Sequence, residues 1–282
     1  MRVLRKVLLP ACFLASLLLP VPPAAAGDAP APDRLTVVTC NILAEEIPSA
    51  RRQAALLNLL EESGADVIAL QEVGRSWRDA LLGAAWVKAS YGWTREGASP
   101  LVPNGNFILS RHPIRKASSA TLPGRQGRTG LKAVIDVGGR ELAVATTHME
   151  SRLEDGPVRA KQLDALFRLL RDAEDAVLLG DLNFGDGEEP ETTHLEKAYA
   201  DLWLSLRPGE AGFTWNIEAS EMARKGSFPG ERSRRLDRIL VRSTAWKPKA
   251  VRIIGDQPVT PGDRKLFPSD HFGVVGVIER AP

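Results

Sequence analysis

Polar side chains of a few recurring types stand where apolar runs of this sequence begin or end. Asn41 follows LTVVTC, Glu72 follows DVIALQ, His148 follows ELAVATT and Asp181 follows AVLLG. The same kind of position, beside an apolar run, is taken by Asn183, Asp237, Asp270 and His271. Carboxylates gathered in one place repel one another unless a cation or protons compensate. Oxygen ligands without cysteine favour a hard ion such as Mg²⁺, which binds through carboxylates plus a phosphate, so these residues predict a phosphate site with a divalent cation.

Each of these positions also has a simpler explanation. Asp181 and Asn183 in GDLNF suit a tight turn, because Asp and Asn bond to their own backbone. Glu72 suits the start of a helix, His148 an ordinary strand, and Asp270 a cap before the last strand. Independent turns would not repeatedly place the same residue types at strand ends, so the combination favours chemistry. A carboxylate beside a histidine, for example, fixes the tautomer and supports the protonated form.

The elements that must position these residues follow from the apolar spacing. Runs rich in Val and Ile predict strands at 35–40, 66–70, 106–110, 131–137, 141–147, 176–179, 237–242, 250–254 and 272–278. Apolar residues spaced as on one helix face predict helices at 50–63, 75–83 and 158–174, the first capped by Ser49. Longer loops are expected at 91–105, 185–198 and 216–235.

One pattern occurs twice along the chain. LTVVTCN, a helix and DVIALQE resemble ELAVATTHME, a helix and DAVLLGDLN. Each unit reads as strand, helix and strand, and each strand ends on polar residues. The repetition predicts two similar α/β layers that meet at one mouth, where the strand ends pool their side chains.

The first 26 residues are expected to be a secretory signal peptide. Three basic residues precede the apolar run VLLPACFLASLLLPV, and three alanines provide a cleavage site before Gly27. A membrane anchor is the alternative, but the run is shorter than the ~20 residues of a span and contains Pro10. Attachment of a lipid at Cys12 fits less well, because the apolar run continues past that cysteine.

Composition and charge limit what the remaining chain does. The whole sequence has 282 residues, of which 44% are hydrophobic and 26% charged, as in a globular protein of one large or two small domains. Residues 27–33 predict a short disordered leader and residues 34–282 one domain. Cleavage would remove three basic residues and no acidic one, so the formal net charge of +2 becomes −1. Any polyanion must then be held by a local patch and a metal, and Cys40, left alone, forms no internal disulfide.

Seven motifs occur in the order typical of the endonuclease/exonuclease/phosphatase superfamily. They are VTCNIL, LQEV, NFILSRHPI, TTHMES, GDLNF, LDRILV and SDHFGV, and the resemblance covers roughly residues 34–279. Within that superfamily, THMESRLEDGPVRAKQL, FTWN and FPSDHFG are similar to the tyrosyl-DNA phosphodiesterase 2-like branch. Gly185 departs from that branch, which carries a basic residue shortly after the asparagine of the GDLNF segment.

The resemblance implies an α/β fold of DNase I-like type, a four-layer sandwich of two packed, mainly antiparallel β-sheets flanked by helices. It implies Mg²⁺, with Mn²⁺ as a substitute, and metal-site residues Glu72, Asn41 and Asp270. The implied catalytic residues are His148, Asp181, Asn183, Asp237 and His271. In that scheme Asp181 orients or activates a water, while His271, oriented by Asp237, stabilises charge that develops on phosphorus.

Substrate and location are further expectations. Predicted substrate-binding residues are Arg111, Trp215 as a base-stacking platform, and Arg234 and Arg235, which belong to a basic run around Asp237 expected to contact a phosphate backbone. We expect an exported monomer, periplasmic or extracellular, without a stable membrane anchor or protein partner, acting on DNA as a nuclease or 5′-tyrosyl-DNA phosphodiesterase-like enzyme, or on another phosphodiester. A sphingomyelinase-like or inositol-phosphate phosphatase-like hydrolase is the alternative, with Tyr91 and Trp93 as the hint of a membrane-contacting loop. A catalytically silent binding module is the alternative from another class.

Overall fold

A computed structural model describes residues 32–44, 49–94 and 105–281. The predicted signal peptide and residues 27–31 of the predicted leader lie outside this part of the chain. Among the residues described, none of the helices has the length and apolar character required to cross a bilayer.

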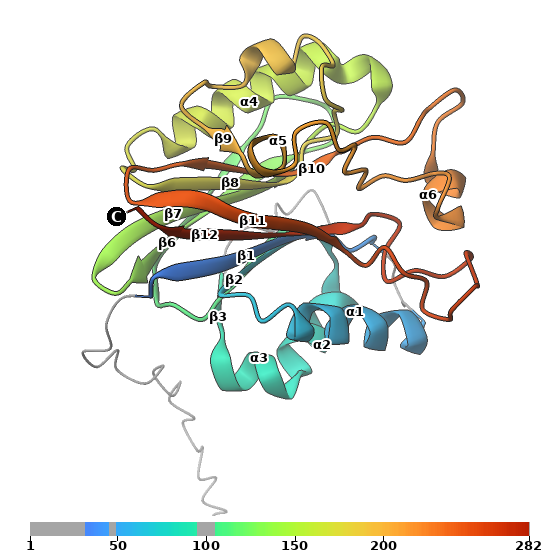
Figure 1. The fold of residues 1–282 in the computed structure, drawn as a ribbon, viewed down its shortest axis with the longest axis horizontal. Helices are drawn as coiled ribbons and strands as arrows, with labels where there is room; N and C mark the ends of the chain where they lie inside the picture. Colours follow the sequence, from blue (N-terminus) through green and yellow to red (C-terminus); the bar gives the residue numbers. More distant parts are fainter. Residues whose placement is uncertain (1–31, 45–48, 95–104, 282) are drawn as a thin grey trace, which may run out of the picture.

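Two six-stranded sheets pack face to face (Figure 1). The first contains, in spatial order, β11 (Trp246–Ile254), β12 (Gly273–Arg280), β1 (Arg34–Asn41), β2 (Val67–Val73), β4 (Gly105–Ser110) and β3 (Gly92–Trp93). The second contains β5 (Ile114–Thr121), β6 (Thr129–Val137), β7 (Arg140–His148), β8 (Ala176–Asp181), β10 (Asp237–Arg242) and β9 (Ala200–Asp201). Most neighbouring strands are antiparallel, as predicted.

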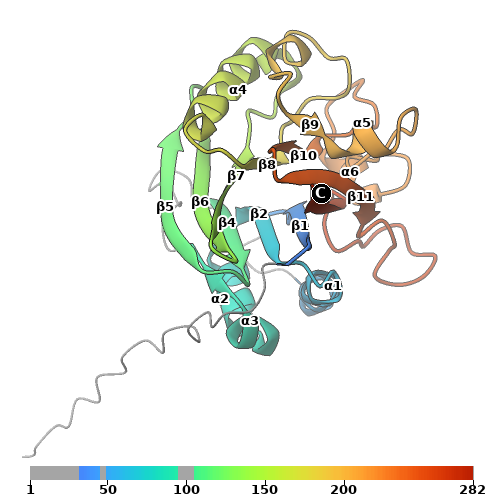
Figure 2. The ribbon, with the colours of Figure 1, turned by 60° about the vertical axis from the view of Figure 1, so that its left-hand side comes forward.

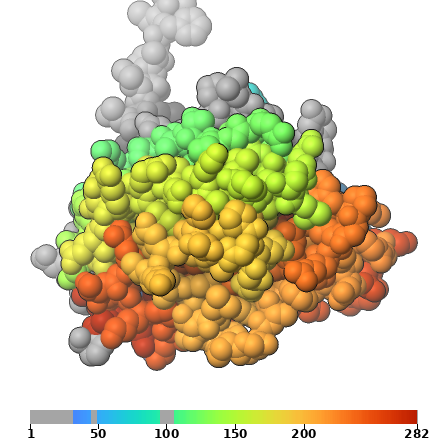
Figure 3. Space-filling view, turned by 90° about the horizontal axis from the view of Figure 1, so that it is seen from above, coloured from blue at the N-terminus to red at the C-terminus, as the bar shows by residue number. Residues whose placement is uncertain are grey.

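Helices cover the outer faces of both sheets. The first sheet is covered by α1 (Ala50–Glu62), α2 (Arg75–Gly83) and α3 (Ala85–Ser90), and the second by α4 (Gly156–Leu170), as Figures 1 and 2 show. In the space-filling view, the yellow-green atoms of α4 and the yellow to gold atoms of the segment after β8 lie side by side on one face (Figure 3). Two short helices, α5 (Leu202–Leu206) and α6 (Glu221–Gly226), follow in the second half of the chain. The four layers confirm the predicted sandwich.

The two strand–helix–strand units are confirmed. β1 and β2 are parallel and joined through α1, and β7 and β8 are parallel and joined through α4. Ser49 caps α1, its hydroxyl oxygen accepting the backbone N–H of Arg52 at 3.3 Å. Because parallel neighbours point the same way, each unit brings two strand ends to the same edge of its sheet.

Alternation along the strands decides which polar side chains face the space between the sheets. On β8, Val177 and Leu179 belong to the core between the two sheets, whereas Leu178 packs under α4. Asp181 follows in the inward set, since successive strand residues point to opposite faces. Cys40 of β1 points outward into the core beneath α1 to α3 and is buried.

Elements absent from the sequence-based prediction are polar or short. β5 reads IRKASSAT, and most of its residues are half-buried or exposed because it forms the edge of the second sheet. Charged and small residues are common on such edges, where they discourage pairing with another chain. The predicted loop 216–235 contains α6, and the predicted loop 185–198 contains a single 3₁₀ turn at Thr192–His194.

Position 180 requires glycine because β7 and β8 approach each other closely there. Its φ is +153°, and a Cβ placed on it would lie 2.3 Å from the carbonyl oxygen of Thr147. Relief of that overlap requires the two strands to separate, so we expect Gly180→Ala to lower the free energy of unfolding by about 3 kcal/mol. Calorimetry should show a drop in Tm of roughly 6–12 °C. Gly139→Ala is the control, because Gly139 also has positive φ but no atom within 4 Å of its Cβ position; equal losses would contradict the steric explanation.

Candidate active site

Three neighbouring strands of the second sheet place acidic and imidazole side chains in one row. His148 on β7 pairs in register with Asp181 on β8, which pairs with Asp237 on β10. All three side chains are at least nine-tenths buried. The first sheet supplies Asn41 at the end of β1 and His271 just before β12. The ends of strands from both sheets therefore meet in one place, as the repeated pattern predicts.

Asn41 ties the two sheets together. Its side-chain nitrogen donates to Glu72 Oε1 and to Asp181 Oδ2, both at 3.0 Å. Its side-chain oxygen accepts the backbone N–H of Leu43 at 3.1 Å, which fixes the orientation of the amide. One neutral residue thus holds two carboxylates in place without adding a third negative charge.

Glu72 reaches the site through an irregularity in β2. Simple alternation would turn Glu72 outward, because Leu70 packs against the helices on the outer face. Glu72 instead has a left-handed backbone with φ 61°, and the pairing of β2 with β4 shifts register between Leu70 and Val73. This bulge returns the carboxylate to Asn41, while its second oxygen accepts the N–H of Ala44 at 2.8 Å. Bulges of this kind commonly re-aim a side chain at a functional site.

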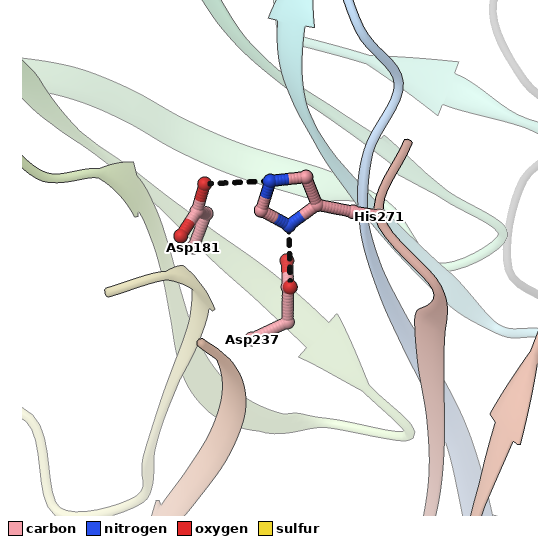
Figure 4. A group of neighbouring side chains, drawn as sticks. All are labelled: Asp181, Asp237 and His271. Carbon is pink, nitrogen blue, oxygen red and sulfur yellow. Dashed lines mark hydrogen bonds and ion pairs between the residues drawn. The ribbon is translucent and has the colours of Figure 1, made fainter. Parts of the chain in front are cut away.

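His271 stands between two aspartates (Figure 4). Its Nδ1 lies 2.8 Å from Asp237 Oδ2, and its Nε2 lies 3.7 Å from Asp181 Oδ2. Burial disfavours the imidazolium, but the charges of Asp237 and Asp181 outweigh that effect and raise the pKa of His271 well above its ordinary value. His271 is therefore a cation at neutral pH, and its Nε2–H is turned toward Asp181.

His148 occupies the other side of Asp181 and carries the opposite protonation. Nδ1 lies 3.6 Å from Glu72 Oε1, and Nε2 lies 3.4 Å from Asp181 Oδ2. Burial, followed by the positive charge of Arg128, lowers the pKa of His148 to about 4. The site thus holds one neutral and one charged imidazole around a carboxylate whose own pKa is lowered, burial being outweighed mainly by His271.

The GDLNF segment is both a turn and part of the site. Asn183 has φ 56°, and its N–H donates to Asp181 Oδ1 at 3.0 Å, which is the local bond expected of an Asp turn. Its side-chain nitrogen donates to the carbonyl of Met149 at 3.0 Å. The turn therefore orients the Asp181 carboxylate and links the end of β8 to the residue after β7.

The donor set fits a hard divalent cation near Glu72 and Asp270. Burial raises the pKa of Asp270, and the Glu72 carboxylate raises it further. A cation near these carboxylates would offset both the burial and the repulsion, and the Glu72 side chain is 23% exposed, which leaves room for water ligands. Asp181, Asp237 and His271 also present atoms within 4.8 Å of one another. In this group His271 Nδ1 is already hydrogen-bonded to Asp237 Oδ2 at 2.8 Å.

Arg111 is a correction to the predicted substrate-binding set. It follows Ser110, which pairs with Val67 at the far end of β2 from Glu72. The Arg111 guanidinium packs over the ring of Tyr91 at 5.2 Å and donates to its hydroxyl at 3.1 Å. Arg111 therefore lies away from the site.

Arg234 and Arg235 are also corrections, because both are buried and paired. The Arg235 side chain is 2% exposed and bonds to Asp186 at 3.0 Å and Asp201 at 2.9 Å. Arg234 is 6% exposed and bonds to Glu188 at 3.1 Å. Neither guanidinium is available to bind a phosphate backbone. Arg234 and Arg235 instead hold the segment before β10 in place through these ion pairs.

Trp215 lies at the site with one face covered. Its ring centroid is 4.9 Å from that of His271, and the residue is only 6% exposed. The neighbouring Thr214 accepts the backbone N–H of Asp237 at 3.0 Å. Trp215 therefore packs against the charged histidine and does not present an open stacking platform of the kind predicted.

Arg128 is a site residue that the sequence analysis missed. It precedes β6, whose Gly130 pairs with Thr147 of β7, so Arg128 lies next to the strand end that carries His148. Burial lowers its pKa, while the charges of Asp181 and Glu72 raise it. Arg128 lies in the segment between β5 and β6, not at a strand end of the two repeated units. Its position depends on β5, whose polar edge sequence gave no strand signal.

Comparisons with known proteins show what this chain is similar to. A family model described as "Endonuclease/Exonuclease/phosphatase family" matches residues 38–271. Tyrosyl-DNA phosphodiesterase 2 of Rattus norvegicus is 29% identical over 147 residues, which is 50% of this chain and 38% of the relative. The Xenopus laevis protein is 29% identical over 259 residues, 85% of this chain and 65% of the relative. The chain thus spans less than two thirds of the length of these relatives.

Solved structures show the same fold at lower identity. The crystal structure of D. rerio TDP2 complexed with single strand DNA product matches with a TM-score of 0.76 and 24% identity, covering 88% of this chain and all of that one. The human Nocturnin catalytic domain with bound sulfate anion matches with a TM-score of 0.68 and 18% identity, covering 88% and 94%.

Proposed function

The chain belongs to the Endonuclease/Exonuclease/phosphatase family, as its seven motifs predicted, and from this membership we propose that it hydrolyses phosphodiester bonds in DNA with a bound divalent cation. One observation carries the proposal. Side chains from positions 41 to 271 of the chain converge on one cluster. Asn41 joins Glu72 to Asp181, and His148 and His271 lie on either side of Asp181.

The arrangement divides the tasks of phosphodiester hydrolysis among these residues. Asp181, ionised and flanked by donors, accepts a proton from an attacking water or orients it. His271, held protonated by Asp237, presents Nε2–H to charge that develops on a phosphoryl oxygen. His148 is neutral and adds a hydrogen-bond donor without changing the net charge. A divalent cation on Glu72 and Asp270 would supply Lewis-acid polarisation and charge neutralisation.

DNA is the favoured substrate class because the curated relatives are named tyrosyl-DNA phosphodiesterase 2 and one solved relative contains a single-strand DNA product. The lipid alternative has weaker support from the described residues. Tyr91 is 6% exposed and packs edge-on against Trp86, so it does not form a membrane-contacting surface.

Gly185 stands where the tyrosyl-DNA phosphodiesterase 2-like branch has a basic residue, and the Arg234 stem lies 3.3 Å from its Cβ position. Because this basic residue is absent, the preferred substrate has to be measured separately from the ability to hydrolyse a phosphodiester.

Removal of the cation tests the proposal. Purified protein lacking residues 1–26 should cleave an oligonucleotide or bis-p-nitrophenyl phosphate in MgCl₂, and EDTA should reduce the rate by about 10³-fold or more, with recovery on adding Mg²⁺ or Mn²⁺. Single-stranded, duplex and 5′-tyrosyl oligonucleotides, sphingomyelin and an inositol phosphate form the panel. If the protein hydrolyses none of these substrates, with or without metal, the proposed enzymatic function is rejected and a binding module is favoured.

We further propose that the protein is exported. The support for export is the basic start, apolar run and alanine site of residues 1–26. Fractionation of expressing bacteria, with amino-terminal sequencing of the product, tests it. A product that begins at Gly27 outside the cytoplasm is expected, and an intact Met1 in the cytoplasm would contradict it.

A further inference from the structure

The loop of residues 122–128, between β5 and β6, is held in one shape by residues that follow β7. Glu150 is 1% exposed, and its Oε1 accepts the backbone N–H groups of Arg125 at 2.6 Å and Gln126 at 2.8 Å. Gly124 makes this approach possible, since it has φ +137° and a Cβ there would lie 2.2 Å from Glu150 Oε1. A buried carboxylate on two backbone donors is a strong local constraint.

Helix α4 fixes the same loop from a second side. Gln162 is fully buried, its side-chain oxygen accepts the N–H of Glu150 at 3.0 Å, and its nitrogen donates to the carbonyl of Pro123 at 2.6 Å. The N–H of Leu122 donates to the carbonyl of Arg128 at 2.9 Å, which closes the loop. The path of the chain from Leu122 to Arg128 is therefore set before any substrate arrives.

Gln126 transmits this constraint to the Arg128 side chain. Its Oε1 accepts from Arg128 Nε at 3.2 Å and Nη2 at 3.1 Å, and also from the N–H of Ser151 at 3.0 Å. Its Nε2 donates to Ser151 Oγ at 3.0 Å. The amide thus clamps one edge of the guanidinium to the segment that leaves the site after His148. β6 begins at Thr129 and its Gly130 pairs with Thr147 of β7, so Arg128 enters this sheet beside His148, where its charge acts on Asp181 and Glu72.

We infer that Gln126 and Glu150 are positioning residues, which hold the Arg128 guanidinium as a fixed cation at the mouth of the site. The inference rests on the proposed function, because a preorganised cation assists a reaction in which negative charge is redistributed on phosphate. A free arginine would lose side-chain entropy on each turnover, and the clamp removes that loss in advance.

A double-mutant cycle tests whether Gln126 acts through Arg128. We expect Gln126→Ala and Arg128→Ala each to lower kcat/KM on a thymidine 5′-phosphodiester with a p-nitrophenyl leaving group, by about 10-fold to 100-fold. The double variant should be no worse than Arg128→Ala alone, because the clamp has nothing left to hold. Losses that multiply in the double variant would overturn the inference. Ser119→Ala on the exposed part of β5 is the control and should match the wild type.

A second measurement does not depend on turnover. Hydrogen exchange of the substrate-free protein should show that Glu150→Ala speeds exchange of the Arg125 and Gln126 amides at least about 10-fold, whereas Glu150→Gln, which keeps the acceptor oxygen, restores protection. Calorimetric titration with inorganic phosphate in EDTA should show equal weakening by Gln126→Ala and Arg128→Ala. If the wild type cleaves no phosphodiester, the proposed function fails, and these two measurements still decide the inference. Unchanged exchange in Glu150→Ala, or unchanged phosphate affinity in Gln126→Ala, would overturn it.

Discussion

Substitution of Asp181 by Asn should lower kcat/KM for phosphodiester hydrolysis by about 10³-fold. The change keeps the shape of the side chain and one acceptor oxygen, so it retains only one of the bonds that Asn41 donates to Oδ2 and Asn183 donates to Oδ1. It removes the negative charge that would accept a proton from water. It also deprives both histidines of their shared partner. Steady-state kinetics at saturating MgCl₂, on an oligonucleotide or bis-p-nitrophenyl phosphate, measures the loss.

The control for that substitution is Asp164→Asn on α4. Asp164 also contacts a histidine, with its Oδ1 2.9 Å from His194 Nδ1, but its side chain is 43% exposed and lies outside the cluster. Its activity should remain that of the wild type, and circular dichroism should show both variants folded. Retention of activity within threefold in a folded Asp181→Asn protein would remove Asp181 from the mechanism.

Asp237→Asn should change the pH dependence of the reaction as well as its rate. In the wild type the pKa of His271 is raised, so His271 stays protonated through neutral pH. Loss of the Asp237 charge lowers that pKa, and the imidazolium is then lost at a lower pH. The alkaline limb of kcat/KM should move toward acid, with a loss of about 10²-fold at pH 8 and a smaller loss at pH 6.

The same pair makes a pH-dependent contribution to stability. Because the folded pKa of His271 exceeds the unfolded value of about 6.5, the stabilisation is complete below that pH and fades as pH rises through the folded pKa.

Asp175→Asn is the matched control for the kinetic effect of Asp237→Asn, since Asp175 is also buried at 2% exposure but lies at the opposite end of β7 and β8. A pH profile of Asp237→Asn that is lowered evenly, without displacement of the alkaline limb, would show that Asp237 does not act through His271.

The sequence predicts those strands whose runs of apolar residues match their burial in the folded protein. β1, β2, β7 and β8 are apolar on both faces because each is covered by a sheet and by helices, and such runs stand out. Their ends carry the polar residues of the site, so Asn41, His148 and Asp181 could be identified from position and type. Within each unit the two strand ends lie together because the strands are parallel neighbours. The two pairs of ends meet because the sheets pack face to face, with Asn41 of one sheet donating to Asp181 of the other.

What the sequence does not reveal is which charges are already paired. The arginines before β10 read as a basic patch, but the partners of Arg235 are Asp186 and Asp201, which lie 49 and 34 residues away. Arg128 shows the reverse failure, since an arginine in a glycine-rich turn carries no signal of its own. Its place beside the carboxylates results from the clamp on Gln126, which is a tertiary contact.

At Glu72, the left-handed backbone lowers the stability of the protein, while the carboxylate is required for the proposed activity. A side chain in that conformation costs on the order of 1–3 kcal/mol, which glycine would largely recover. Glycine would also delete the carboxylate that Asn41 and Ala44 hold. A mutant library screened for heat resistance alone would therefore tend to discard this acid, so engineering of this protein requires selection for activity at the same time.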